Sequence, residues 1–156
     1  MGAALDAVSA VEGRGESGPL FLYPIDNPPI FGSMTRFFLA TGAVFAGLAV
    51  AAGAFGAHGL DGRVTPDRLE TFRTAVSYQM YHALALLVVG WAAAQGWGGL
   101  VHGAGYCFIT GILVFSGTLY LLVLTDTSWL GAITPFGGVA FIVGWGLLAW
   151  GVLQGA

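Results

Sequence analysis

The sequence predicts an integral membrane protein that folds as an all-α bundle of four transmembrane helices. Charged residues make up only 8% of the chain, whereas a soluble domain carries roughly a quarter. Hydrophobic residues reach 56% and the mean hydropathy is +0.80. Asp, Glu, Lys and Arg are also absent from three long stretches, residues 37–57, 74–125 and 127–156. Because water would not solvate such an apolar surface, the chain is expected to fold in a lipid bilayer.

The first predicted span covers residues 37–57. Its 21 residues give about 31 Å of helix, enough to cross a hydrocarbon core of about 30 Å. An export signal with Arg36 in its basic region is the alternative. Such signals have a shorter apolar core of roughly 7 to 15 residues, so a transmembrane helix is favoured.

The residues before this span, 1–33, differ from the rest of the chain. Gly, Pro and Ser are frequent there and no apolar period is sustained, which predicts a disordered tail. Translation from Met34 is an alternative, because Met34 directly precedes the apolar run. A native peptide spanning Ser33 to Thr35 would refute it. The predicted membrane domain is residues 34–156.

Three further spans are predicted at about residues 75–94, 101–124 and 135–153. The second helix should begin before it enters the membrane, because Thr65 and Pro66 match an N-cap and a first helical residue. Thr134 and Pro135 repeat this pattern before the fourth span. Four spans place both termini on the same side of the membrane. The loop between spans one and two has a slight excess of arginine, which favours a cytoplasmic position for this loop and places both termini on the opposite side.

Small residues recur at helical spacing on one face of each span, which predicts close helix packing in lipid. These faces comprise Gly42, Ala46, Ala49, Gly53 and Gly56 on the first span; Ala75, Gln79, His82, Ala83, Leu86 and Gly90 on the second; Gly103, Cys107, Gly111 and Thr118 on the third; and Gly137, Gly144 and Gly151 on the fourth.

Gln79 and His82 are the polar residues placed deepest in the second span, three residues apart on its packing face. Ionisable groups at such depth are functional candidates, here as a haem or metal ligand or a proton-relay group. We favour a neutral His82 hydrogen-bonded across the bundle, because no acidic partner lies in any span. Trp145 lies too near the centre of its span to belong to an interfacial aromatic belt.

Five further polar residues complete the candidate site. His58 lies where the first span ends; the helix dipole favours it there without any function, and a ligand role is the alternative. Ser116 and Tyr120 lie one turn apart on the third span and are expected to bond a neighbouring helix or the preceding turn. Asp126 lies on the same side as Arg73 and His58, which predicts an Arg73–Asp126 ion pair, with a proton entrance at Asp126 as the alternative.

Other classes of site lack a signature in the sequence. No clustering of His, Cys or carboxylates has zinc or calcium spacing, so we expect no metal and no resident cofactor. There is no nucleophilic triad, P-loop or dinucleotide fingerprint, which disfavours an enzyme. The net charge of −3 and the lack of a basic stripe disfavour nucleic acid as a partner.

Four blocks in this order resemble the domain of unknown function 423 family, also called transmembrane protein 256-like. They are Gly53–Leu60; Phe72–Ala75 with Tyr78, Gln79 and His82–Leu87; Gly111 through Tyr120; and Leu130–Gly138. The resemblance runs from Met34 to the C-terminus. It implies a small multi-pass protein of bacterial plasma membranes, with mitochondrial relatives as the alternative location, and it supplies no catalytic residues.

Three functions remain open at this point. The leading hypothesis is a structural, assembly or accessory component that packs against another membrane protein or a second copy of itself. A small transporter or proton-coupled carrier is the second, motivated by Gln79, His82 and Asp126. A haem- or quinone-binding subunit is the third.

Overall fold

The computed structural model describes residues 32–155, and within them four helical segments are long and apolar enough to cross a membrane. The predicted fold class, an all-α bundle of four transmembrane helices, is confirmed. The predictions of a disordered tail and of a start at Met34 concern residues that lie largely outside the described part. The segments are α2 (Ser33–His58); α3 (Pro66–Ala94); a third made of α4 (Leu100–Gly111), the π-helical turn η1 (Ile112–Ser116) and α5 (Gly117–Thr125); and a fourth made of the 3-10 turn η2 (Ser128–Ala132) and α6 (Thr134–Gly155).

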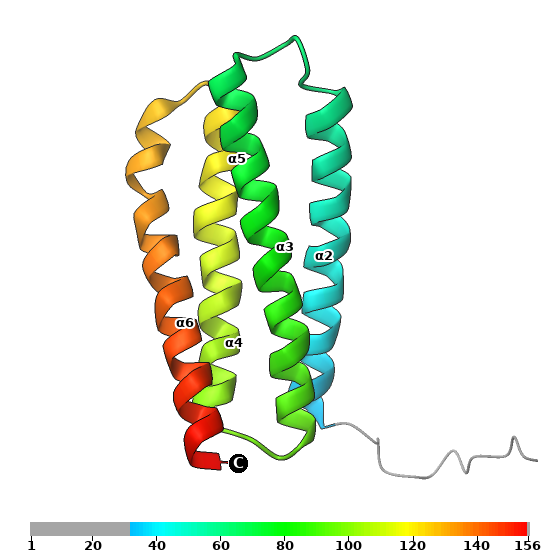
Figure 1. Cartoon of the computed structure of the whole chain (residues 1–156), viewed down its shortest axis with the longest axis vertical. Helices are drawn as coiled ribbons and strands as arrows, with labels where there is room; N and C mark the ends of the chain where they lie inside the picture. The colour runs from blue at the N-terminus through cyan, green and yellow to red at the C-terminus, as the bar shows by residue number, and fades with distance from the viewer. Residues whose placement is uncertain (1–31, 156) are drawn as a thin grey trace, which may run out of the picture. The chain divides into compact units, whose positions relative to one another are not determined.

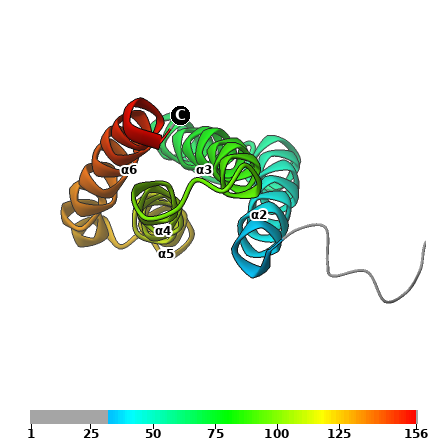
Figure 2. The same cartoon turned by 90° about the horizontal axis from the view of Figure 1, so that it is seen from below.

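The four segments run up and down, so the start of α2 and the end of α6 lie at the same end of the bundle (Figure 1). Seen along the axis, α2 lies beside α3, and α3 and α6 both pack against the third segment (Figure 2). α2 is the least buried of the four, because it contacts mainly α3. α2 is therefore held in the bundle mainly by its contacts with α3, and the rest of its surface is exposed.

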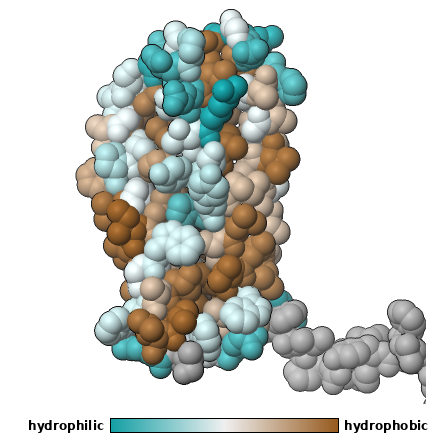
Figure 3. Space-filling model, viewed as in Figure 1, coloured by the Kyte–Doolittle hydropathy of each residue, from teal (hydrophilic) through white to brown (hydrophobic). Residues whose placement is uncertain are grey.

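Residue polarity follows the bundle axis in the way that a bilayer requires. On the face shown in Figure 3, strongly hydrophilic residues are densest at the upper end and recur at the lower edge, and between them hydrophobic residues are mixed with weakly polar ones. Large apolar side chains are exposed in that zone, among them Leu113, Ile142 and Leu121. Such exposure is stable only in hydrocarbon, because water would penalise it by about 25 cal/mol per Å².

Glycines on the predicted packing faces let the helix backbones approach closely. A Cβ atom at Gly42 of α2 would lie 2.9 Å from the carbonyl oxygen of Ala83 in α3. One at Gly144 of α6 would lie 2.7 Å from the Phe108 ring in α4. Both glycines are buried. Any larger residue at these positions would force the helices apart.

The third segment departs from the regular helix that the sequence predicts. Its backbone widens into a π-helical turn over Ile112–Ser116, between α4 and α5. Ser116 is fully buried at the end of this turn, and its hydroxyl donates to the carbonyl of Ala75 in α3 at 2.9 Å. π-helical turns occur often at functional sites, which draws attention to the surface beside it.

The two predicted N-caps have different outcomes. Thr65 caps α3 as predicted, because its hydroxyl accepts from the backbone N–H of Arg68 at 3.4 Å and Pro66 follows it. The prediction for Thr134 is wrong. Thr134 is itself helical, and its hydroxyl shares a 2.9 Å hydrogen bond with Thr118 of α5. It therefore joins two helices instead of capping one.

Candidate functional site

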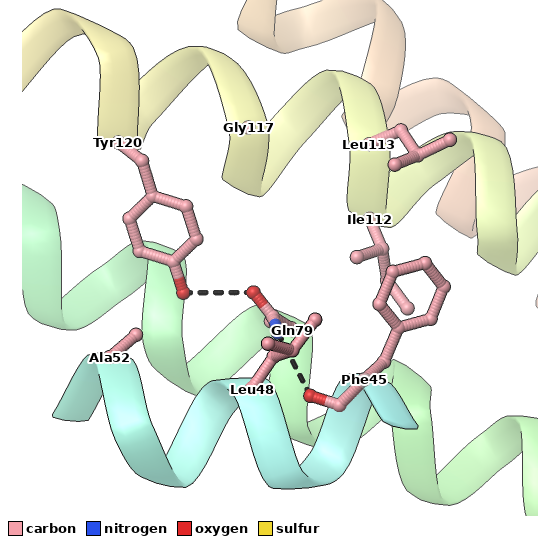
Figure 4. A pocket seen from close by; sticks show the side chains of 8 residues that line it. All are labelled: Phe45, Leu48, Ala52, Gln79, Ile112, Leu113, Gly117 and Tyr120. Atoms are coloured by element: carbon pink, nitrogen blue, oxygen red, sulfur yellow. Dashed lines mark hydrogen bonds between the residues drawn. The ribbon is translucent and has the colours of Figure 1, made fainter. Parts of the chain in front are cut away.

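Gln79 lies at the centre of a hydrogen-bonded bridge between three helices. Its side chain, only 5% exposed on α3, donates from Nε2 to the carbonyl of Phe45 in α2 at 2.8 Å. Its Oε1 accepts from the phenol of Tyr120 in α5 at 2.9 Å, and Figure 4 shows the two side chains pointing toward each other. Two of the predicted site residues are thus brought together. The bridge links α2 to the third segment across α3.

An open apolar groove of about 340 Å³ surrounds this bridge. We call it the Gln79 groove. Its wall on the third segment is hollow at Gly117, where an added Cβ atom would meet nothing within 4 Å. The groove lies between α2 and the third segment, as the close view shows (Figure 4). It is lined by Phe45, Leu48, Ala52, Gln79, Ile112, Leu113, Gly117 and Tyr120.

His82 forms a separate hydrogen-bonded group one turn from Gln79. The indole N–H of Trp145 in α6 donates to His82 Nε2 at 3.2 Å. Because indole is only a donor, Nε2 must be unprotonated, so Nδ1 carries the hydrogen and donates to the carbonyl of Tyr78 at 2.7 Å. The ring also stacks on Phe141 with 3.4 Å between centroids. His82 is therefore a neutral imidazole whose two nitrogens are both engaged.

This arrangement explains why Trp145 can lie near the centre of its span, away from the membrane–water interface. Its indole N–H has a buried hydrogen-bond partner there, His82. It also weakens two of the three functional hypotheses. A haem or metal ligand at His82 would have to displace Trp145, and a proton relay would have to break one of the two hydrogen bonds. Neither the carrier hypothesis nor the haem or quinone hypothesis gains support from the site.

The predicted Arg73–Asp126 ion pair is wrong, because Asp126 pairs with Arg68. Arg68 Nη2 lies 2.6 Å from Asp126 Oδ1 and also donates to the hydroxyl of Ser128 at 2.9 Å. Arg68 and Arg73 are five residues apart on α3, so they project about 140° from each other. Arg68 faces the end of α5, while Arg73 is exposed. The pair joins the start of α3 to the loop after α5.

Two further predicted residues stay outside the groove and the His82 group. His58 is exposed in the last turn of α2 and Arg73 is exposed on α3. Over residues 32–155, no three His, Cys, Asp or Glu side chains lie close enough to hold a metal ion.

Sequence reasoning missed the groove residues Phe45, Leu48 and Gly117. Helical spacing places Gly111, which packs against Phe141, on the predicted packing face and leaves Gly117 off it, but no sequence signal shows that Gly117 borders a groove. Both are glycines in the same apolar segment. Only the direction in which each faces distinguishes them.

Comparison with known proteins identifies the family. The model of a family described as a protein of unknown function (DUF423) matches residues 52–138, more than half of the chain. The chain belongs to the DUF423 family. The predicted resemblance to the domain of unknown function 423 family is thereby confirmed.

Relatives of this DUF423 protein carry names that call them membrane proteins. UPF0382 membrane protein YwdK of Bacillus subtilis (strain 168) is 51% identical over 111 residues, which cover 70% of this chain and 90% of the relative. UPF0382 membrane protein SAB0533 of Staphylococcus aureus (strain bovine RF122 / ET3-1) is 48% identical, with 72% and 92% covered. UPF0382 membrane protein SERP0230 of Staphylococcus epidermidis is 46% identical, with 76% and 97% covered.

No solved structure matches this DUF423 protein. Its bacterial relatives and its four apolar helices make it a small multi-pass membrane protein.

Proposed function

We propose that this DUF423 protein is a non-enzymatic accessory component of the bacterial plasma membrane that packs against another membrane protein through the outward face of α2. The observation that carries the proposal is a second row of small residues on that helix. This outward row consists of Ala40, Ala43, Gly47, Ala51 and Ala54, all exposed.

The outward row has the spacing of a helix-packing face. Its steps of three and four residues keep the row within about 80° of the helix circumference. Ala43, Gly47 and Ala51 repeat the small-x-x-x-small pattern that lets two transmembrane helices approach closely. The row lies on the side of α2 away from Gly42 and Ala49, which are buried against α3. α2 is thus suited to pack between two helices, of which the bundle supplies one.

The buried polar groups support a structural role over a catalytic one. Gln79, Tyr120 and Ser116 each bond to a neighbouring helix, and His82 receives a hydrogen bond from α6. In lipid, such bonds stabilise helix association. The bacterial relatives support the plasma membrane as the location, since their names call them membrane proteins.

Native purification followed by mass spectrometry tests the proposal, with Gly47→Leu as the disrupting variant. Leucine at Gly47 would cover the outward row, yet a Cβ atom there meets nothing within 4 Å, so the bundle itself should fold. Gly146→Leu is the matched control, because Gly146 is an exposed glycine on α6 that also faces open space.

We expect a stoichiometric membrane protein partner with the wild type and with Gly146→Leu, and its loss with Gly47→Leu. A clean monomer or homodimer in the wild type would count against the proposal. Retention of the partner by Gly47→Leu would remove the outward row from the interface.

A further inference from the structure

A second cavity lies at the end of the bundle where α3 begins and α5 ends, and its lining has the charge to hold an anion. This polar-end cavity has a volume of about 310 Å³. Arg63 and Arg68 contribute two positive charges to it and Asp126 one negative charge, which leaves a net charge of +1. Among residues 32–155 Arg63 makes no ion pair. The cavity is lined by Arg63, Val64, Thr65, Arg68, Val123 and Asp126.

The polar-end cavity follows the Gln79 groove along α5, because neighbouring residues of this helix line the two. Gly117, Tyr120 and Val123 follow one another at intervals of three residues, so each is turned by about 60° from the one before and the row winds around about a third of this helix. Gly117 and Tyr120 line the groove, and Val123 lines the polar-end cavity. Gly117 and Val123 are six residues apart, about 9 Å along the axis.

This order of surfaces matches the order of groups in a phospholipid. Headgroups occupy a layer about 5 to 7 Å thick on each side of the hydrocarbon core, and the acyl chains continue inward from it. Arginine guanidinium groups are well suited to phosphate, and basic pockets between transmembrane helices bind lipid headgroups. The groove below is lined mainly by apolar side chains and opens toward the hydrocarbon.

We propose that one phospholipid binds along α5, with its phosphate in the polar-end cavity and an acyl chain in the Gln79 groove. Arg63 and Arg68 bind the phosphate, and the missing side chain at Gly117 makes room for the chain. The net charge of +1 at one end and the apolar groove at the other favour a phospholipid over a partner helix, which would bring no phosphate. The site is on a different side of α2 from the outward row, so it stands independently of the proposed partner interface.

Native mass spectrometry of the full-length protein in detergent, with palmitoyl-oleoyl phosphatidylglycerol as the probe, tests this proposal. Gly117→Leu fills the groove, and Gly146→Leu is its control because both glycines face open space. Arg63→Gln removes one cavity charge, and Arg36→Gln is its control because Arg36 is an exposed arginine near the opposite end of the bundle. Circular dichroism and elution volume report whether each variant folds.

The expected result is one bound lipid in the wild type and in both controls. Gly117→Leu should weaken binding about tenfold or more, because leucine and the acyl chain cannot share the groove. Arg63→Gln should weaken it about fivefold, as loss of one arginine near an anionic headgroup does. If Gly117→Leu does not fold, Leu48→Trp tests the same groove from α2, where Leu48 is 54% exposed.

Three results would overturn the proposal. Equal lipid binding by Gly117→Leu and its control Gly146→Leu would show that lipid contacts the protein surface without occupying a specific site. Displacement of the probe by free palmitate, but not by excess phosphatidylglycerol headgroup analogue, would show a chain site with no phosphate recognition. Occupation of the groove by a polypeptide that Gly117→Leu releases would show a helix-docking site instead.

Discussion

Tyr120→Phe removes a single oxygen atom from the bundle and tests whether the Gln79 bridge stabilises it. The Tyr120 hydroxyl donates to Gln79 Oε1 at 2.9 Å, a normal hydrogen-bond length. No other donor to Oε1 is present in the described part of the chain, and the Gln79 side chain is only 5% exposed. The substitution therefore leaves a buried carbonyl oxygen without a partner.

The expected loss in the free energy of unfolding can be estimated from hydrogen bonds measured in a membrane protein. These average about 0.6 kcal/mol and reach at most about 1.7 kcal/mol, because the helices separated in the membrane also find partners. Burial of Gln79 favours the upper half of this range, so we expect about 1 kcal/mol for Tyr120→Phe. Gln79→Leu should cost more, because it also removes the bond to the Phe45 carbonyl.

A double-mutant cycle isolates the interaction between Tyr120 and Gln79. Tyr120→Phe should cost little in a Gln79→Leu background, which gives a coupling free energy of about 0.6 kcal/mol or more. The assay is unfolding in mixed micelles by added dodecyl sulfate, followed by circular dichroism. Tyr81→Phe is the matched control, because Tyr81 is 61% exposed and makes no side-chain hydrogen bond in residues 32–155. A coupling near zero, or equal costs for Tyr120→Phe and Tyr81→Phe, would refute the reasoning.

Two further predictions concern packing and the ion pair. Gly144→Leu should destabilise the protein by about 1–3 kcal/mol in the same assay, because its Cβ atom would lie 2.7 Å from a ring carbon in α4, whereas Gly146→Leu should change stability by less than about 0.5 kcal/mol. Similar costs for the two would contradict the observed packing. Arg68→Gln should lower the free energy of unfolding by up to about 1 kcal/mol and Arg73→Gln by almost nothing, since among residues 32–155 Asp126 pairs only with Arg68. The Arg68 effect should shrink in high salt, and an equal effect at Arg73 would contradict this pairing.

Much of the fold was predictable because membrane insertion depends on local composition. An apolar run long enough to cross the bilayer must satisfy its backbone hydrogen bonds internally, and an α-helix does so without any partner. The small-residue faces were predictable for a similar reason, since helical spacing alone determines which residues share a face. Gly42, Gly144 and their neighbours accordingly lie at the contacts between helices.

The candidate site was predictable only in part. Depth in the membrane can be judged along one helix, so Gln79, His82 and Tyr120 were found from the sequence. Their partners could not be found this way, because a partner depends on how two helices are rotated relative to each other. The ion pair illustrates this, since Arg68 and Arg73 both lie in the first turns of α3 but project in different directions around it.

Composition and helical period were enough to show that this chain lies in a membrane, how many helices cross it, and which face of each helix is made of small residues. These properties depend on composition and helical period within a single segment. The packing of the helices determines that Tyr120 bonds Gln79, that Trp145 bonds His82, and that a groove opens beside Gly117. Each of these depends on the rotation and distance between separate helices, and in lipid the close fit between side chains sets that geometry.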